Sequence, residues 1–230
     1  MLDSRRTVAS VVLDHSECAA VFQRHRIDYC CRGDTTIAAA CEKLGLPTDS
    51  LLAELGAAID ARLPKSADDD VRALSTPQLV ARIVTRHHGY LRTALPFVGA
   101  LADKVARVHG DRDERLRDVA AMTRQLSDVL IPHLDEEERE LFPHLLAEPV
   151  DLALVRRELS SMREEHLLVG KLLEHVRAAS DDFRAPDWAC NSYRTLLTEL
   201  ENLETDVLVH VHLENHELMP RFMGAPSRES

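Results

Sequence analysis

The amino-acid sequence predicts an all-α protein, in which a small helical domain precedes an up-down bundle of four long helices. The chain is rich in Leu, Ala, Glu and Arg, whereas aromatic residues make up only 4% of it and glycine only 8 of its 230 residues. Such a composition is typical of helical proteins. In the later part of the chain, apolar residues recur three and four positions apart over long stretches, and no strand-like alternation competes with this spacing.

Four long helices are expected in the bundle, over about residues 76–109, 113–146, 152–179 and 186–222. The segments between them are short and polar, and four long helices with short connections form an up-down bundle. Pro96 and Pro132 fall inside two of these helices. Each proline is therefore expected to kink its helix or to mark a local distortion.

A small helical domain is expected over residues 1–63. Its helical segments are "SECAAVFQRH", "DTTIAAACEKLG" and "TDSLLAELGAAIDARL". Asp34 is the expected N-cap of the second segment, Gly45 its stop signal, and Thr48 the start of the third.

The polar stretch "PKSADDD" predicts a linker between the two parts of the chain. The expected boundaries are a linker over residues 64–75, a bundle over 76–223 and a tail over 224–230.

Composition excludes several classes of protein. A net charge of −11 argues against binding to nucleic acid or to anionic membranes, since both require a basic face. No run of eighteen apolar residues predicts a membrane span, and Asp14 and His15 interrupt the N-terminal apolar stretch too early for a signal peptide. The five cysteines, two of them adjacent, do not suggest a disulfide framework, so we expect a cytoplasmic protein.

The bundle contains a repeated motif. "HLDEEERELFP" at residues 133–143 and "HVHLENHELMP" at residues 210–220 share His, Glu, Glu, Leu and Pro, and they are one helical hairpin apart. Each hairpin also contains an earlier histidine, because His88 precedes His133 by nearly the same number of residues as His166 precedes His210. This matching separation predicts that each earlier histidine lies level with the His-x-x-x-Glu pair across its hairpin.

The motif favours a metal site over a solvated helix face. Helical residues four apart lie on one face, about 6 Å apart along the axis. Exposed ion pairs are the alternative, but they would not require two copies at hairpin spacing. Buried carboxylates are costly without cationic partners, and a metal offsets that cost. Four imidazoles and two carboxylates are too many ligands for one zinc ion and suit two six-coordinate iron or manganese ions.

The bundle resembles the hemerythrin-like di-iron domain, and nearly the whole chain resembles the RIC family, the repair-of-iron-centres proteins. The motifs that carry the resemblance are "IDYCCRGD", "RHHGYLRTALP", "HLDEEERELFP", "REEH" and "HVHLENHELMP". The resemblance implies two iron ions, oxo- and carboxylate-bridged. It also implies six protein ligands, with four terminal histidines and two bridging glutamates: His88, His133, His166, His210, Glu137 and Glu214.

Several neighbouring residues leave alternatives open. Of His87 and His88, His88 fits the family's "R-x-H" phrase, although the sequence alone does not exclude His87. Oxygen-carrying hemerythrins use a fifth histidine, and its lack here implies more open coordination. Glu165 is a candidate base beside the ligands or a residue on an iron path. Four other glutamates of the motifs are expected in solvent, Glu136, Glu138, Glu140 and Glu217, with an inward orientation as the alternative for Glu140 and Glu217.

Cys30 and Cys31 form a candidate thiol or redox site in the turn "IDYCCRGD". They are either a packed turn or a thiol pair that handles iron or nitric oxide or exchanges redox equivalents. Related proteins typically continue this pair with Gly-Gly, whereas here Arg32 and Gly33 follow. Arg32 could lower the pKa of the thiols, or it could block a position that is only backbone in the family.

The resemblance implies a cytoplasmic protein that repairs iron–sulfur clusters damaged by oxidative or nitrosative stress, as an iron donor. Its expected partners are proteins with damaged clusters or apo-acceptors, and also nitric oxide or dioxygen. A monomer or homodimer is expected. One alternative is an enzyme that reduces nitric oxide at the di-iron site, and another is a hemerythrin-like sensor or carrier of dioxygen or nitric oxide.

Overall fold

The structure, a computed structural model, describes residues 2–61 and 70–223. Within these residues the fold is all-α, as predicted, and the single extended pairing is an antiparallel bridge between Thr7 and Thr36. The chain divides into two compact units, one of residues 80–208 and one that combines the residues up to Leu79 with those from Val209 onward. No helix in the described part of the chain is long and apolar enough to cross a lipid bilayer.

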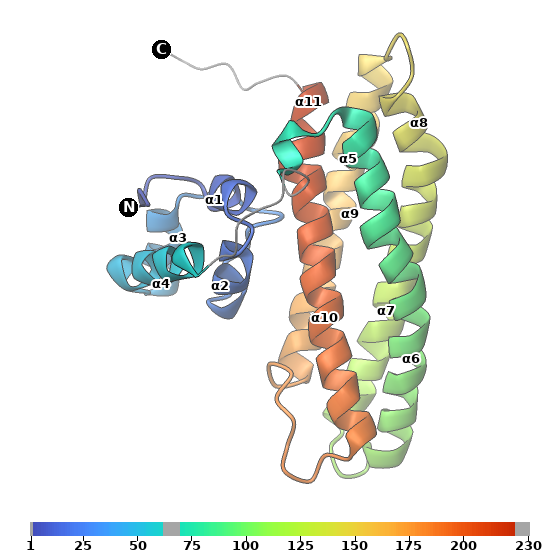
Figure 1. Ribbon diagram of the computed structural model, residues 1–230. Helices are drawn as coiled ribbons and strands as arrows, with labels where there is room; N and C mark the ends of the chain where they lie inside the picture. Colours follow the sequence, from blue (N-terminus) through green and yellow to red (C-terminus); the bar gives the residue numbers. More distant parts are fainter. Residues whose placement is uncertain (1, 62–69, 224–230) are drawn as a thin grey trace. The chain divides into compact units, whose positions relative to one another are not determined.

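Four long helices run side by side in the unit of residues 80–208 (Figure 1). They are α6 (Gly89–His109), α7 (Arg115–Glu136), α9 (Leu152–Ala179) and α10 (Asn191–Leu213), and α10 continues past the end of this unit. All four contribute to one buried apolar core, which includes Val98, Leu116, Val176 and Leu197. The apolar stripe of each helix thus faces a common interior, and the predicted helical bundle is confirmed.

Three helices depart from α geometry, which the sequence analysis did not predict. Helix α5 (Thr76–Arg82) continues into the π-helical segment η3 (Ile83–His88) before α6. After α7 come the π-helical segment η4 (Glu137–Leu141) and α8 (Phe142–Leu145), and after α10 come η5 (Glu214–Leu218) and α11 (Pro220–Met223). π-Helical turns are rare and are frequent at functional sites.

Prolines account for two of the three π-helical segments. Pro143 and Pro220 stand just after η4 and η5. Because proline lacks an N–H, the ladder of i to i−4 hydrogen bonds must be interrupted there in any case. By contrast, α6 and α7 are continuous through Pro96 and Pro132, so the distortions lie elsewhere than the sequence analysis expected.

The other unit contains the N-terminal helices, α1 (Val8–Asp14), α2 (Cys18–Arg24), α3 (Ile37–Leu44) and α4 (Thr48–Asp60), followed by a 3-10 turn, η2 (Val71–Ala73). The sequence analysis did not predict α1. Phe22, Ile37 and Leu55 are fully buried in this unit. Residues 64–69 of the expected linker and the expected tail, 224–230, lie outside the described residues.

The expectation that Asp34 caps α3 is wrong. The helix begins at Ile37, and the hydroxyl of Thr36 accepts a hydrogen bond from the Ala39 N–H at 3.2 Å. Thr36 also takes part in the bridge to Thr7, which fixes it in the extended conformation that an N-cap requires. Gly45 ends the helix with a φ of 66°, a left-handed conformation that glycine adopts without steric cost, so the predicted stop is confirmed.

Candidate metal centre

The six residues predicted as ligands are all buried, none more than 4% exposed. Three of them adjoin the π-helical segments, since His88 ends η3, Glu137 begins η4 and Glu214 begins η5. The other three lie on regular helix, in the order α7, α9 and α10: His133, His166 and His210.

Glu137 lies between two imidazole rings. One of its carboxylate oxygens is 3.4 Å from His88 Nε2, and the other is 3.5 Å from His133 Nε2. The side chain is 3% exposed, and neither oxygen makes a hydrogen bond to any described residue. A buried carboxylate without hydrogen bonds is strongly destabilising. The site therefore requires a positive charge close to Glu137.

The opposite nitrogens of the same two rings have carboxylate partners. His88 Nδ1 lies 2.8 Å from Glu138 Oε1, and His133 Nδ1 lies 2.7 Å from Glu165 Oε2. An ionised carboxylate can only accept, so both Nδ1 atoms carry the proton and donate it. A neutral ring with its proton on Nδ1 then directs the lone pair of Nε2 toward Glu137. Two lone pairs and a carboxylate repel one another unless a cation lies among them, and this pairing of carboxylate with histidine is common around bound metals.

The pKa values of both outer carboxylates agree with this assignment. The hydrogen bond from His133 lowers the pKa of Glu165. Burial raises the pKa of Glu138, but hydrogen bonds from His88 and from Arg92, at 3.0 Å, outweigh burial and lower it overall. Both groups are therefore ionised acceptors at neutral pH. Glu165 was predicted to lie beside the ligands, whereas the sequence analysis assigned Glu138 to solvent.

The second His-x-x-x-Glu pair has the same spacing and closer contact. His210 Nε2 lies 2.8 Å from Glu214 Oε1, and both side chains are at most 1% exposed. On α7 and α9, the rings of His133 and His166 meet edge to face with centroids 5.2 Å apart.

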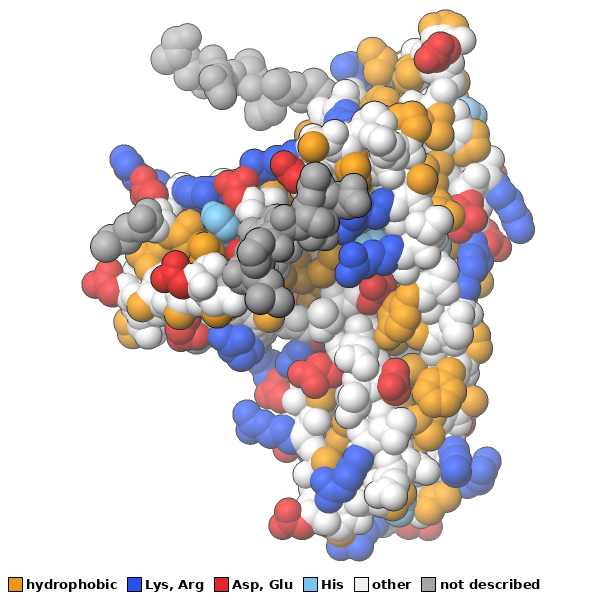
Figure 2. Space-filling model, viewed as in Figure 1, with side chains coloured by type: hydrophobic (Ala, Val, Ile, Leu, Met, Phe, Trp, Pro, Cys, Tyr) orange, Lys and Arg blue, Asp and Glu red, His pale blue; other side chains and the backbone are white. Residues whose placement is uncertain are grey.

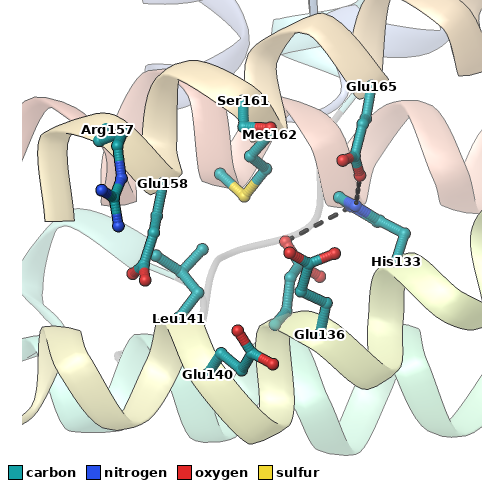
Figure 3. A pocket seen from close by; sticks show the side chains of 10 residues that line it. His133, Glu136, Glu140, Leu141, Arg157, Glu158, Ser161, Met162 and Glu165 are labelled. Atoms are coloured by element: carbon teal, nitrogen blue, oxygen red, sulfur yellow. Dashed lines mark hydrogen bonds and ion pairs between the residues drawn. The ribbon is translucent and has the colours of Figure 1, made fainter. Parts of the chain in front are cut away.

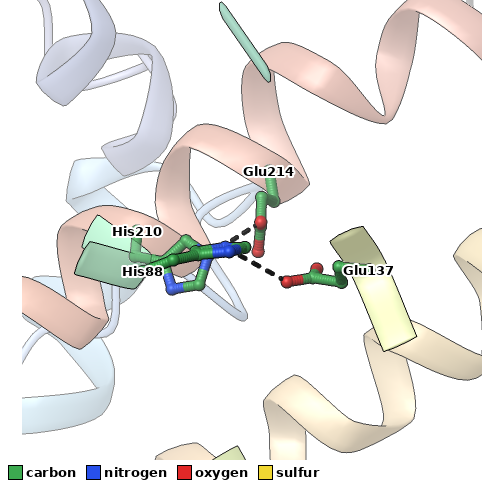
Figure 4. Close-up of side chains that lie close together, drawn as sticks. All are labelled: His88, Glu137, His210 and Glu214. Carbon is green, nitrogen blue, oxygen red and sulfur yellow. Dashed lines mark hydrogen bonds and ion pairs between the residues drawn. The ribbon is translucent and has the colours of Figure 1, made fainter. Parts of the chain in front are cut away.

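The predicted ligands form two groups, in each of which the ligand atoms lie within 4.8 Å of one another. The first group, drawn in Figure 4, is His88, Glu137, His210 and Glu214. The second group is His133, Glu137, His166 and Glu214. Two glutamates thus belong to both groups, and four histidines divide evenly between them. Four nitrogen and oxygen donors around one point suit a transition-metal ion.

A cavity of about 340 Å³ opens beside His133, between α7, η4 and α9 (Figure 3). The charged residues that line this cavity are mostly acidic, and Arg157 is the only Lys or Arg among them. The acidic residues are Glu136, Glu137, Glu140, Glu158 and Glu165. An acidic cavity concentrates cations. Glu140, for which an inward orientation was the alternative, faces this cavity and belongs to neither ligand group.

Other polar residues of the motifs have partners outside the two groups. His87 is buried, and its Nδ1 lies 2.9 Å from Asp206 Oδ1. Glu217 pairs with Arg221 at 2.5 Å. His144 pairs with Glu158 at 3.0 Å.

Cys30 and Cys31 lie in a buried turn of the unit that contains the N-terminal helices. Their sulfur atoms are 3.5 Å apart, and Asp28 Oδ1 lies 3.4 Å from Cys30 Sγ. The three residues form a further group with ligand atoms within 4.8 Å of one another. The hydrogen bond with Cys31, followed by burial, raises the pKa of Cys30 well above that of an ordinary thiol. The effect is opposite to the lowering by Arg32 that the sequence suggested as one alternative.

The second copy of the repeated motif anchors this turn. His216 and Asn215 donate hydrogen bonds to the carbonyl oxygen of Cys30 at 2.8 and 3.0 Å. His212 donates to the carbonyl oxygen of Tyr29 at 3.0 Å. These three residues are not predicted ligands: His212 lies between His210 and Glu214 in the motif, and Asn215 and His216 follow Glu214. Together they hold the cysteine turn in place.

Gly33 is required by close packing in the same turn. A Cβ atom at this position would lie 2.6 Å from Ala9 Cβ and 2.9 Å from His216 Nε2. Both distances are shorter than real Cβ contacts allow, so only glycine lets the turn approach α1 and η5 this closely.

Acidic and basic side chains are interspersed on the face of the molecule shown in Figure 2. The described residues on this face form no extended basic patch, in agreement with the net charge of −11.

The fold agrees with the comparisons to known proteins. Residues 79–222 match the family model described as Hemerythrin HHE cation binding domain, and residues 4–59 match ScdA_N, described as Domain of Unknown function (DUF542). The chain belongs to the hemerythrin HHE family, and the additional N-terminal match confirms the resemblance to the repair-of-iron-centres proteins.

Relatives that align with most of the chain occur in Yersinia strains. The chain is 32% identical over 209 residues to the iron-sulfur cluster repair protein YtfE of Yersinia pseudotuberculosis serotype O:1b (strain IP 31758), covering 87% of this chain and 89% of the relative. It is 30% identical over 224 residues to the protein of the same name from serotype IB (strain PB1/+), covering 94% and 96%. The relative of that name from Yersinia pestis (strain Pestoides F) is 32% identical over 209 residues, covering 87% and 89%.

Proposed function

We propose that this chain is a di-iron protein that repairs damaged iron–sulfur clusters by donating iron. The observation that carries the proposal is the position of Glu137, a buried carboxylate without hydrogen bonds that faces the Nε2 lone pairs of His88 and His133. A cation is needed there, and the cation-binding family and the repair proteins among the relatives favour iron.

In this proposal each of the two ligand groups holds one iron ion. The shared glutamates, Glu137 and Glu214, bridge the two ions, and the histidines are terminal ligands. When bound, the two irons supply a redox-active centre whose metal can be given up to an acceptor. His88 and His133 keep their protons on Nδ1, because Glu138 and Glu165 accept them, so Nε2 stays available as a donor atom.

The chemistry of the ligands also affects how readily iron is released from the site. Two carboxylates and four neutral imidazoles leave a net positive charge on a pair of ferrous or ferric ions. Protonation of an imidazole Nε2 competes directly with metal binding. The acidic cavity beside His133 offers a departing cation four carboxylates besides that of Glu137.

The proposed organisation follows the boundaries expected from the sequence, with a domain over residues 1–63, a linker over 64–75, a bundle over 76–223 and a tail over 224–230. All six ligands lie in the bundle. The thiols Cys30 and Cys31 lie in the N-terminal domain and, with Asp28, offer soft ligands through which iron passes to an acceptor.

Transfer of iron to a damaged cluster tests this function. The iron-loaded protein is mixed under anaerobic conditions with an iron–sulfur protein whose cluster has lost iron, and recovery of the acceptor's cluster absorption is followed. We expect recovery with the full chain, slower recovery after Cys30→Ser and Cys31→Ser, and none with Glu137→Gln. Retention of iron by the wild-type chain in the presence of the acceptor would refute iron donation, and sustained turnover of nitric oxide with an electron donor would assign the centre to nitric oxide reduction instead.

A further inference from the structure

A thiol and an imidazole meet in the unit of residues 80–208, at the start of α10. Cys190 immediately precedes the helix, and its sulfur lies 3.2 Å from Nε2 of His109, the last residue of α6. Cys190 is exposed, whereas the remaining cysteines, Cys18, Cys30, Cys31 and Cys41, are buried. A thiol within hydrogen-bond reach of a base is the arrangement found in cysteine nucleophiles.

Aromatic side chains hold the imidazole in place. The ring of His109 stacks on Tyr193, with centroids 6.2 Å apart and an interplanar angle of 27°. It also contacts Trp188, with centroids 5.7 Å apart. Because Tyr193 is only 3% exposed, its position is fixed by the core of the bundle. The base is therefore fixed in orientation by its packing rather than free in solvent.

The backbone places the Cys190 thiol at a helix terminus. The carbonyl oxygen of Cys190 accepts the hydrogen bond from the Arg194 N–H, so Cys190 occupies the N-terminal end of a 23-residue helix. Unpaired amides at a helix N-terminus stabilise an anion. Asp113 and Asp181 are the carboxylates that act electrostatically on the neighbouring Tyr193, and Asp113 is bound by Arg115 at 2.8 Å.

Among the described residues, an arginine without a carboxylate partner contacts the same tryptophan as His109. The guanidinium of Arg112 is 4.2 Å from the centroid of the Trp188 ring, which also contacts His109. Within residues 2–61 and 70–223, no carboxylate pairs with Arg112. An exposed arginine without a carboxylate partner can bind the carboxylate of an incoming small molecule.

We propose that Cys190 is a site of reversible S-thiolation by low-molecular-weight disulfides that carry carboxylates. His109 accepts the thiol proton, and the thiolate attacks one sulfur of the disulfide. The S–S bond of the small molecule breaks, a mixed disulfide with Cys190 forms, and the released thiolate takes the proton from His109. No electrons beyond those of the disulfide are required. Cys190 is the only cysteine of residues 80–208, so the unit contains no second thiol to displace the mixed disulfide.

Oxidised glutathione is the probe for this site. The full chain, loaded with its metal, is incubated with it at neutral pH, and intact mass with peptide mapping follows the product. One glutathione should add per chain, at Cys190, and none in Cys190→Ser. His109→Gln should slow the addition roughly tenfold or more, because an ordinary thiol with a pKa of about 8.5 is only a few per cent ionised at neutral pH without a base. The matched control is His144→Gln, a half-exposed histidine of the same unit that pairs with Glu158 and contacts no thiol.

The role of Arg112 is tested by changing the charge of the disulfide. Arg112→Gln should slow the reaction with oxidised glutathione and leave unchanged the reaction with bis(2-hydroxyethyl) disulfide, which has no carboxylate. Equal effects on the two disulfides would overturn the assignment of Arg112.

The wild-type chain provides a test that does not depend on the folding of any variant. Cys190 in the folded chain should react faster than Cys190 in the chain unfolded by urea at the same pH. A slower or equal rate would overturn the proposal, as would first addition at Cys30 or Cys31 or equal rates for His109→Gln and His144→Gln.

Discussion

Replacing Glu138 by Gln tests the outer carboxylates of the site without removing a proposed ligand. In the structure the Glu138 carboxylate accepts the Nδ1 proton of His88 at 2.8 Å and is held from the other side by Arg92 at 3.0 Å. His88 is 1% exposed, so no water replaces a lost partner. A glutamine can still accept the hydrogen bond, but it no longer supplies the charge that makes the imidazole a strong donor to metal.

The expected magnitude follows from the type of contact. Loss of a carboxylate that orients a metal-binding histidine typically weakens metal binding about 10- to 100-fold, which corresponds to about 1.4 to 2.7 kcal/mol. The assay is competition for ferrous iron with a chromophoric chelator under anaerobic conditions. Glu136→Gln is the matched control, because Glu136 is exposed, lies in the same turn and contacts no histidine. Equal affinities of the two variants would refute the idea that Glu138 supports a metal ligand.

Three further predictions concern the bridging glutamates, the effect of the metal on stability and the Cys18 thiol. Glu137→Gln and Glu214→Gln should each reduce the iron content of purified protein far more than Glu136→Gln or Glu140→Gln, measured by elemental analysis, and similar losses in all four would refute the assignment of the bridges. Chelation should lower the melting temperature, because a metal held at about 100 times its Kd contributes about 2.7 kcal/mol, and equal midpoints with and without iron in calorimetry would contradict a core site. Burial, with a smaller contribution from the charge of Glu17, raises the pKa of Cys18 to about 12. Its contribution to stability is therefore complete below pH 9 and is lost as the pH rises toward 12, so the free energy of unfolding of Cys18→Ala, measured with denaturant between those values, should fall less steeply with pH than that of the wild-type chain.

Periodicity was sufficient to predict the main helices. The expected helix over residues 152–179 coincides with α9. Its start is fixed by Asp151, whose side chain accepts hydrogen bonds from the N–H groups of Ala153 and Leu154. In contrast, α1 was not predicted. Its sequence "VASVVLD" is short and rich in the β-branched residue valine, so the pattern is equally compatible with a strand.

The sequence could not reveal the π-helical segments. An α-helix and a π-helix bury the same apolar residues, so the spacing in "ELFP" and "ELMP" does not distinguish them. The shared proline was the available signal, because its missing N–H must interrupt the helix near each candidate ligand.

The candidate site was predictable where a motif repeats and not where it depends on contacts between helices. The His-x-x-x-Glu spacing identified His133 with Glu137 and His210 with Glu214 as buried pairs. Glu138 was assigned to solvent because it stands in a run of acidic residues, and only the neighbouring helix, with His88 and Arg92, gives it a partner. His109 and Cys190 are far apart in the sequence, and no local pattern links them.

Metal analysis of the full-length protein, purified without added metal from iron-replete cells, tests the central proposal most directly. Two ligand groups that share Glu137 and Glu214 predict about two irons per chain, and Glu137→Gln should lose most of this iron while keeping its helical circular dichroism. A single zinc per chain, or the same iron content in Glu137→Gln as in the wild-type protein, would contradict the proposed di-iron centre.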